Sequence, residues 1–80
     1  MEQVEKQLRR MPRQDRERVL DAMERIIQRN FLGLNRKQLR GSGYIFRIRV
    51  GNYRILYFDN GSEIEFIAVR RKNETTYNDF

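Results

Sequence analysis

The amino-acid sequence predicts an α+β fold in which a helical hairpin packs on one face of a small antiparallel β-sheet. Apolar residues recur at helical spacing up to about residue 29, and after Gly43 apolar and polar residues alternate with a period of two. A chain of 80 residues has room for one helical layer and one sheet. We therefore expect residues 1–80 to form a single domain.

Two amphipathic helices account for the first third of the chain. Val4, Leu8 and Met11 recur at helical spacing, which predicts a short helix over residues 2–10. Pro12 ends this helix and suits the first turn of a second one. The second helix carries an apolar stripe made of Val19, Leu20, Met23, Ile26 and Ile27.

Residues 30–43, "NFLGLNRKQLRGSG", separate the helices from the sheet. The segment mixes Gly, Asn and Ser with three leucines and shows no regular period. This composition predicts a loop that contacts the core at a few points.

Two turn signals set the predicted pairing of the strands. Gly51-Asn52 is a plausible two-residue hairpin loop and places Arg49 opposite Arg54. Asn60-Gly61 is a second such signal and places Tyr57 opposite Ile64. Both registers agree on which residues share a face, and a slip of one residue would put arginines into the core.

The predicted faces differ sharply in chemistry. The apolar face, on which the helices pack, is expected to hold Tyr44, Phe46, Ile48, Val50, Tyr53, Ile55, Tyr57, Ile64, Phe66 and Ala68. The other face is expected to hold Arg47, Arg49, Arg54 and Arg71 together with Ile45, Leu56, Phe58, Ile67 and Val69.

Arginines placed opposite each other destabilise a sheet, by a few tenths to about 1 kcal/mol per pair. A polyanion such as RNA relieves this repulsion when it binds, so the arrangement favours a phosphate-binding surface. The alternative is that the arginines extend into water or pair with Glu63 and Glu65.

The composition also indicates a polyanionic partner. Seventeen Lys and Arg residues against eleven Asp and Glu residues give a net charge of +6 and a pI near 10.3. Residues 30–58 hold six bases and no acid. A basic protein without a nucleic-acid partner is the alternative that composition leaves open.

Several classes of chemistry are excluded by absent residue types. The chain has no cysteine and no histidine, so it has no disulfide, no thiolate metal site and no histidine general base. We expect no metal and no small-molecule cofactor. The chain has no apolar stretch of the ~20 residues that span a membrane and begins with the polar "MEQVEKQLRR", so we expect a cytoplasmic protein without a membrane partner.

The segments "YIFRIRVGNYRILYF" and "VRRKNETTY" resemble the RelE toxins of the RelE/ParE superfamily of type II toxin-antitoxin systems. The shared motif has two alternating bases on one strand, a Gly-x-Tyr-Arg hairpin, a strand that ends in a basic cluster, and a tyrosine six residues after the last key arginine. The similarity covers residues 39–77, including "LRGSGY". The five motif positions are Arg47, Arg49, Arg54, Arg71 and Tyr77.

The resemblance implies an endoribonuclease that cuts messenger RNA in the ribosomal A site without a metal. In that reaction a ribose 2′-hydroxyl attacks the adjacent phosphate. By resemblance, Arg54 and Arg71 clamp this phosphate, Tyr77 stacks on a base, and Arg47 and Arg49 take part in proton transfer and phosphate contact. Further RNA-binding residues are expected at nearby bases, namely Arg36, Lys37, Arg40, Arg70 and Lys72.

This chain departs from the family pattern in three ways. Arginine replaces the lysines that better-known members carry at positions 47 and 49, and a guanidinium is a poor general base. The fold is also expected to lack the family's first strand and its C-terminal helix.

The resemblance implies three partners: the ribosome, messenger RNA and a cognate antitoxin. We expect the antitoxin's binding segment to be apolar with acidic residues, because residues 30–58 contain no acid. Two alternative functions stay open. One is a ParE-like toxin that inhibits DNA gyrase, and the other is a nuclease-inactive relative that binds RNA or the ribosome.

Overall fold

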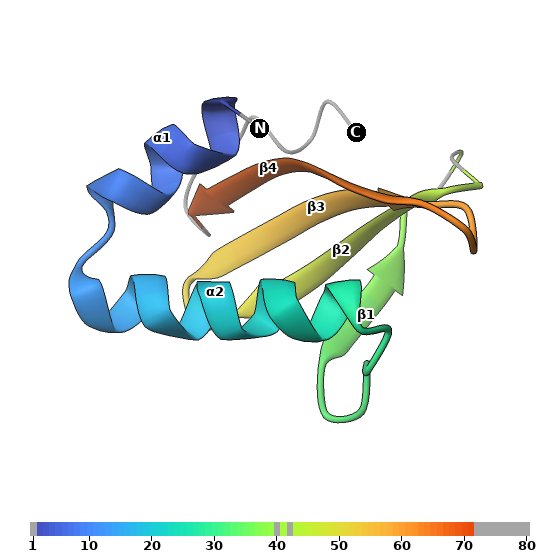
Figure 1. Ribbon diagram of the computed structural model, residues 1–80, viewed down its shortest axis with the longest axis horizontal. Helices are drawn as coiled ribbons and strands as arrows, with labels where there is room; N and C mark the ends of the chain where they lie inside the picture. The colour runs from blue at the N-terminus through green and yellow to red at the C-terminus, as the bar shows by residue number, and fades with distance from the viewer. Residues whose placement is uncertain (1, 40, 42, 72–80) are drawn as a thin grey trace.

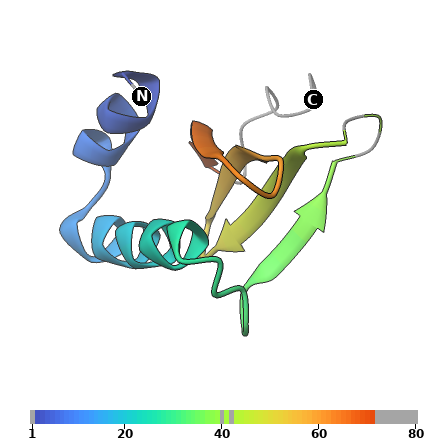
Figure 2. The same cartoon turned by 45° about the vertical axis from the view of Figure 1, so that its right-hand side comes forward.

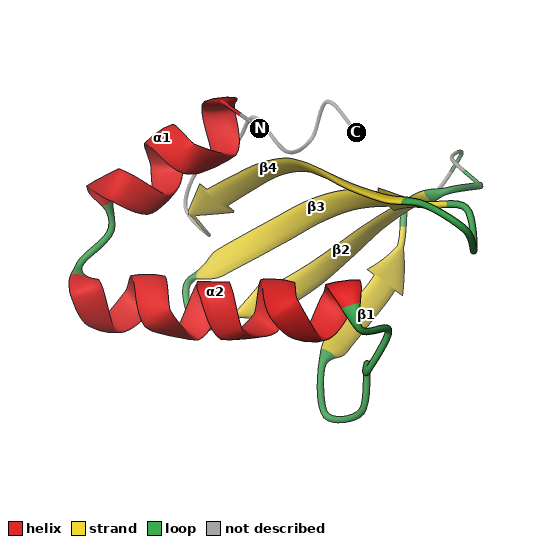
Figure 3. Ribbon diagram, viewed as in Figure 1, coloured by secondary structure: helices red, strands yellow, loops and turns green. Residues whose placement is uncertain are grey.

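The computed structural model describes residues 2–39, 41 and 43–71 (Figure 1). Their elements follow the order α1 (Glu2–Arg10), α2 (Arg13–Ile27), β1 (Asn35–Gln38), β2 (Ile45–Val50), β3 (Tyr53–Asp59) and β4 (Ile64–Arg71). The strands form one sheet in the order β1-β2-β3-β4, with every neighbouring pair antiparallel (Figure 3). The predicted α+β class is confirmed.

Both helices lie on the same side of the sheet, as the apolar pattern predicts (Figure 2). Pro12 stands directly before α2, and its carbonyl accepts the first helical hydrogen bond, from the Arg16 N–H at 2.9 Å. The core between helices and sheet comprises Val4, Met11, Val19, Ala22, Met23, Ile26, Ile48, Tyr53, Ile55, Tyr57, Phe66 and Val69. The opposite side of the sheet is not covered by either helix.

The C-terminus of α2 is closed by a residue in the left-handed region. Arg29 has a φ of 58°, and the N–H of Asn30 donates to the carbonyl of Arg25 at 2.9 Å. Glycine usually fills this position because it has no Cβ. An arginine stands here, and its side chain forms an ion pair described below.

The expectation that residues 30–43 form only a loop is wrong, because β1 lies within them and pairs with β2. Arg36 lies opposite Ile48, and Lys37 lies opposite Arg47. All four residues of β1 are exposed. The strand therefore gives no alternating apolar signal, and its pairing comes from backbone hydrogen bonds along the edge of β2.

The register of β2 with β3 is confirmed residue by residue. Val50 lies opposite Tyr53, Arg49 opposite Arg54 and Ile48 opposite Ile55. Gly51 adopts a φ of 57° at the first loop position, which only glycine adopts without strain. Glycine at that position is typical of a type II′ turn, whose twist matches the twist of the strands.

The predicted register of β3 with β4 is wrong by two residues at the turn. Asp59, not Tyr57, lies opposite Ile64. The loop is longer than predicted because two side chains bond to its backbone. The Asp59 carboxylate accepts the Gly61 N–H at 2.8 Å, and the Asn60 side-chain oxygen accepts the N–H groups of Ser62 and Glu63 at 2.9 and 2.7 Å.

A β-bulge in β4 shifts the register once more. Tyr57 lies opposite Phe66 but Leu56 lies opposite Ala68, so Ile67 has no partner in the ladder. Beyond the bulge, Val69 joins the core, and Ala68 points to the opposite face. The faces predicted for Ala68, Val69 and Arg71 are therefore wrong.

Candidate nucleic-acid interface

Three arginines lie side by side across the face of the sheet that points away from the helices. Arg49 lies opposite Arg54 on β3, and Arg54 lies opposite Arg70 on β4. Side chains directly opposite each other in a sheet have Cβ atoms about 5 Å apart. We call Arg49, Arg54 and Arg70 the arginine row.

Two further bases extend the positive charge along the sheet. Arg47 follows the arginine row on β2 and points to the same face, because alternate residues of a strand share a face. Lys37 lies opposite Arg47 on β1 and is exposed. We call the arginine row together with Arg47 and Lys37 the basic face.

Three guanidinium groups of the basic face have no carboxylate partner among the described residues. Arg47, Arg49 and Arg70 form no ion pair with an acid in residues 2–39, 41 and 43–71. Within the same residues, the Nε atoms of Arg47 and Arg70 have no hydrogen-bond partner. Arg54, only 6% exposed, lies between the other two members of the row. Arg49, an exposed member of the row, and Arg70, a half-buried one, are thus positive charges that no described carboxylate neutralises.

Arg71 does not belong to this face, contrary to the sequence prediction. It lies opposite Tyr53, whose ring is in the core. Burial and a hydrogen bond donated to the Asp15 carboxylate at 3.1 Å raise the pKa of Tyr53, and the charge of Arg71 partly opposes this shift. Because of the bulge, Arg70 occupies the position on the basic face that was predicted for Arg71.

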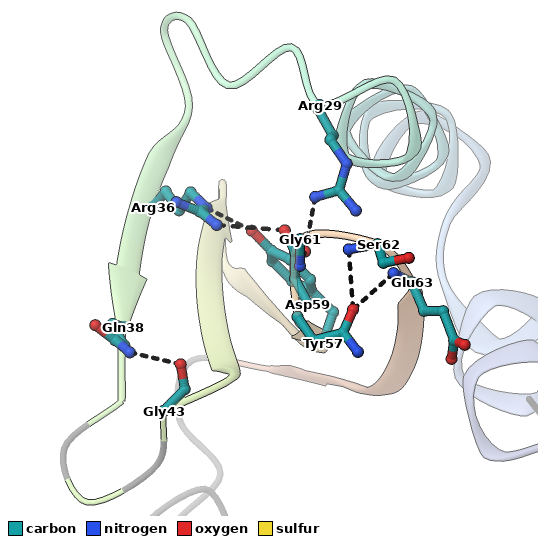
Figure 4. Close-up of polar contacts among 10 residues, drawn as sticks. Arg29, Arg36, Gln38, Gly43, Tyr57, Asp59, Gly61, Ser62 and Glu63 are labelled. Carbon is teal, nitrogen blue, oxygen red and sulfur yellow. Dashed lines mark hydrogen bonds and ion pairs between the residues drawn. The ribbon is translucent and has the colours of Figure 1, made fainter.

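Arg36 also lies on the helix side of the sheet, away from the basic face. Its guanidinium carbon stands 4.2 Å from the ring centre of Phe31 and 3.9 Å from that of Phe46. Its Nε donates to the Tyr57 hydroxyl at 2.7 Å (Figure 4). These contacts tie β1 to the core.

Asp59, which the sequence analysis did not single out, is the centre of this polar cluster. Its carboxylate is 4% exposed and accepts from Arg29 Nη1 at 2.7 Å and from Arg36 Nη2 at 3.4 Å (Figure 4). Asp59 is the first acid after Glu24, and that isolation was the signal available in the sequence. We call Asp59, Arg29, Arg36 and Tyr57 the Asp59 cluster.

The ionisation of the cluster follows from burial and from its charges. Burial alone raises the pKa of Asp59, but the hydrogen bonds from Arg29 and the Gly61 N–H, with the charges of both arginines, outweigh it and leave this pKa below its ordinary value. Burial also raises the pKa of Tyr57, against the opposing effect of Arg36.

Three residues expected at the site, Arg40, Lys72 and Tyr77, lie outside the described residues. Of the bases expected to bind RNA, Lys37 and Arg70 lie on the basic face and Arg36 does not. In the described part of the chain, no group of three or more His, Cys, Asp or Glu side chains is placed to hold a metal ion.

Two helices lie on one face of a four-stranded antiparallel sheet (Figure 2), and basic residues gather on the other face. Together they define a small α+β protein suited to bind a polyanion. The family model described as the ParE toxin of the type II toxin-antitoxin system parDE matches residues 1–75. The chain belongs to this toxin family, within the RelE/ParE superfamily expected from the sequence.

A solved structure supports the same assignment. The crystal structure of the RelB-RelE antitoxin-toxin complex from Methanococcus jannaschii contains a chain that is 32% identical, with a TM-score of 0.78. The match covers 96% of this chain and 92% of that chain. Comparison with curated proteins gives no match.

The lengths and compositions of the two described helices can be compared with those of a membrane-spanning helix. Neither α1 nor α2 is long and apolar enough to cross a bilayer.

Proposed function

We propose that this toxin is a ribosome-dependent endoribonuclease that cuts messenger RNA in the A site. The observation that carries the proposal is the arginine row, in which three arginines lie next to one another on neighbouring strands. Guanidinium groups bind phosphate through paired N–H donors and stabilise charge that develops on phosphate oxygens. The similarity to a RelE chain supports the same activity.

The proposed reaction is a transfer within the RNA backbone. The 2′-oxygen forms a bond to the adjacent phosphorus as the bond to the 5′-oxygen breaks, which leaves a cyclic phosphate and a 5′-hydroxyl. The 2′-hydroxyl loses one proton and the leaving oxygen gains one. The protein contributes mainly by holding the RNA in line and by stabilising the negative charge of the pentavalent phosphate.

We assign roles by position on the sheet. Arg49, Arg54 and Arg70 hold the scissile phosphate, with Arg70 in the role first expected for Arg71. Arg47 and Lys37 hold the neighbouring phosphate. Tyr77 stays proposed as a residue that stacks on a base. None of the arginines serves well as a general base, because a guanidinium stays protonated below about pH 12.

Cleavage mapped on programmed ribosomes tests this proposal. Wild-type protein is expected to cut inside the A-site codon and leave 5′-hydroxyl ends. Arg49→Ala is expected to cut at least about 100-fold more slowly, as is typical when one charge-stabilising donor is lost. The control is Arg13→Ala, because Arg13 is an exposed base on α2 that pairs, among the described residues, with Glu17 alone. Intact RNA with folded wild-type protein would contradict the proposal.

A gyrase-inhibiting toxin is the second candidate, favoured by the match to the ParE family model. It predicts growth arrest with intact messenger RNA and loss of supercoiling by purified gyrase. A protein that binds ribosomes but neither cuts RNA nor inhibits gyrase would instead be the nuclease-inactive relative.

We also propose a cognate antitoxin as partner, since the similar RelE chain was crystallised with RelB. Its binding segment is expected to be apolar with acidic residues that meet the basic face. A complex of this kind weakens as salt rises, because charge pairs at its rim are screened. Affinity measured by calorimetry between 50 and 500 mM salt checks this, and an affinity independent of salt would contradict it.

A further inference from the structure

An aromatic pair lies at the end of the basic face that is farthest from the Gly51 turn. The ring of Tyr44 packs edge-on against the ring of Phe58, with centroids 5.7 Å apart and an interplanar angle of 66°. Phe58 lies opposite Ile45 on β2. Since Tyr57 and Asp59 point to the helix side, Phe58 points to the basic face.

Tyr44 is far more exposed than an aromatic ring in a core. Its exposed fraction is 55%. The other large apolar residues exposed in the described part of the chain, Leu20, Ile27 and Leu32, lie in α2 or in the loop after it. Tyr44 is therefore the large exposed apolar side chain that adjoins the basic face.

The backbone holds Tyr44 in place. The carbonyl of Tyr44 accepts the Asp59 N–H at 2.8 Å, and the neighbouring carbonyl of Gly43 accepts the Gln38 side-chain amide at 2.8 Å. The chain bends at Gly43 and Tyr44, so strand alternation does not fix the direction of the Tyr44 ring. Its contact with Phe58 does.

The pair lies one step beyond the cations along the sheet. Ile45 lies two residues before Arg47 and on the same face of β2. Successive side chains on one face of a strand are about 7 Å apart. An RNA strand with one phosphate bound by Arg47 and Lys37 could therefore place the neighbouring base on the aromatic pair. Glu65, opposite Phe58 on β4, repels phosphate from that side and directs the backbone toward β1 and β2.

We propose that Tyr44 and Phe58 form a base-stacking platform for single-stranded RNA, with the phosphate next to the stacked base held by Arg47 and Lys37. Stacking suits any base, because every base has a flat π-face. The adjoining positive charge selects a polyanion over an apolar peptide. The inference rests on the proposed function for the identity of the ligand as RNA.

Binding of a non-cleavable RNA tests the platform without requiring cleavage. The probe is a hexanucleotide of 2′-O-methylcytidine, which lacks the attacking hydroxyl. Tyr44→Ala is expected to lower affinity about 5- to 100-fold, the range for the loss of one stacked base, and to leave the slope of affinity against salt unchanged. Lys37→Ala is expected to lower the affinity and also to flatten that slope by about one.

Two controls separate stacking from general loss of apolar surface. Tyr44→Phe keeps a flat ring and is expected to bind within about two-fold of wild type. Leu32→Ala removes a side chain that is 85% exposed in the loop after α2 and is expected to change nothing.

A direct readout comes from Tyr44→Trp. The chain has no tryptophan, so this variant carries a single indole. Its fluorescence is expected to be quenched by the RNA along the same curve as binding, and not by the same probe with abasic sites.

Equal RNA affinity of wild type and Tyr44→Ala overturns the platform and leaves the cleavage proposal standing. An indole that responds to the antitoxin but not to RNA also overturns it and assigns the surface to protein contact. If the platform binds the probe but programmed ribosomes keep intact RNA, the platform stands and the cleavage proposal fails.

Discussion

At the scale of single residues, the basic face places like charges opposite each other, which lowers the stability of the free protein. Arg49 lies opposite Arg54, and Arg54 opposite Arg70, so both cross-strand pairs of the arginine row join like charges. Such pairs are unfavourable in the free protein and become favourable when an anion lies between them. Active sites commonly retain destabilising residues for this reason.

Removal of one charge from the row is expected to stabilise the fold. Arg49→Gln is expected to raise the free energy of unfolding by about 0.2–1 kcal/mol, because it removes one like-charge pair on an exposed position. Urea unfolding followed by circular dichroism measures this. Arg9→Gln, on the exposed face of α1, is the control and is expected to change little. A loss of stability in Arg49→Gln would contradict the account of the row.

Asp59 is expected to make the folding stability of the protein depend on pH in the acidic range. Its pKa is lowered in the folded protein, so its contribution is complete above about pH 4, the ordinary value, and is lost as the pH falls through the lowered value. Wild type is expected to lose stability as the pH falls below about 4. Asp59→Asn is expected to be about 1–3 kcal/mol less stable at pH 7 and to have a flatter pH profile. Parallel profiles for the two proteins would count against this.

At the scale of elements, β1 depends on a side-chain anchor more than on its own apolar residues. Arg36 connects the strand to Phe31, Phe46, Tyr57 and Asp59, whereas the rest of β1 is exposed. The anchor also holds Lys37 beside Arg47, because neighbouring residues of a strand move together. The Asp59 cluster on one side of the sheet thus positions a cation on the other side.

Arg36→Ala is expected to release β1 locally. Amide hydrogen exchange in residues 35–38 is expected to quicken at least ten-fold while β3 stays protected, since local opening requires less free energy than global unfolding. Lys37→Ala is the matched control, because Lys37 is a neighbouring base on the other face of the same strand. Equal protection of β1 in both variants would show that Arg36 is not the anchor.

The sequence predicted the elements that local chemistry determines. The helical spacing of apolar residues predicted both helices. Gly51 predicted the hairpin of β2 and β3, because only a residue tolerant of positive φ fits at that turn position. Three features of the sheet were not predicted from the sequence. The pairing of β1 is made by backbone atoms, the longer loop is set by side-chain bonds of Asp59 and Asn60, and the bulge at Ile67 has no signature in composition.

The same bulge explains how far the site could be predicted. Arg47, Arg49 and Arg54 were placed correctly on one face because they lie on the hairpin whose register was right. Arg70 and Arg71 were exchanged because the extra residue reverses the faces of everything that follows it.

At the scale of the whole molecule, the core and the proposed binding surface lie on opposite sides of one sheet. The helices lie on one side of the sheet (Figure 2), where the core is, and the register of the strands places the basic face on the other. Substitutions on the basic face are therefore expected to change binding with little effect on the core. This separation makes paired substitutions on the two sides of β4 informative.

The most direct test of the account compares Arg70→Ala with Arg71→Ala in messenger-RNA cleavage on programmed ribosomes, with circular dichroism confirming that both fold. These neighbouring arginines have the same charge and lie on opposite sides of the sheet. The account predicts that Arg70→Ala cuts at least about 100-fold more slowly while Arg71→Ala stays within about three-fold of wild type. Loss of cleavage in Arg71→Ala with full cleavage in Arg70→Ala would contradict the assignment of the site to the basic face.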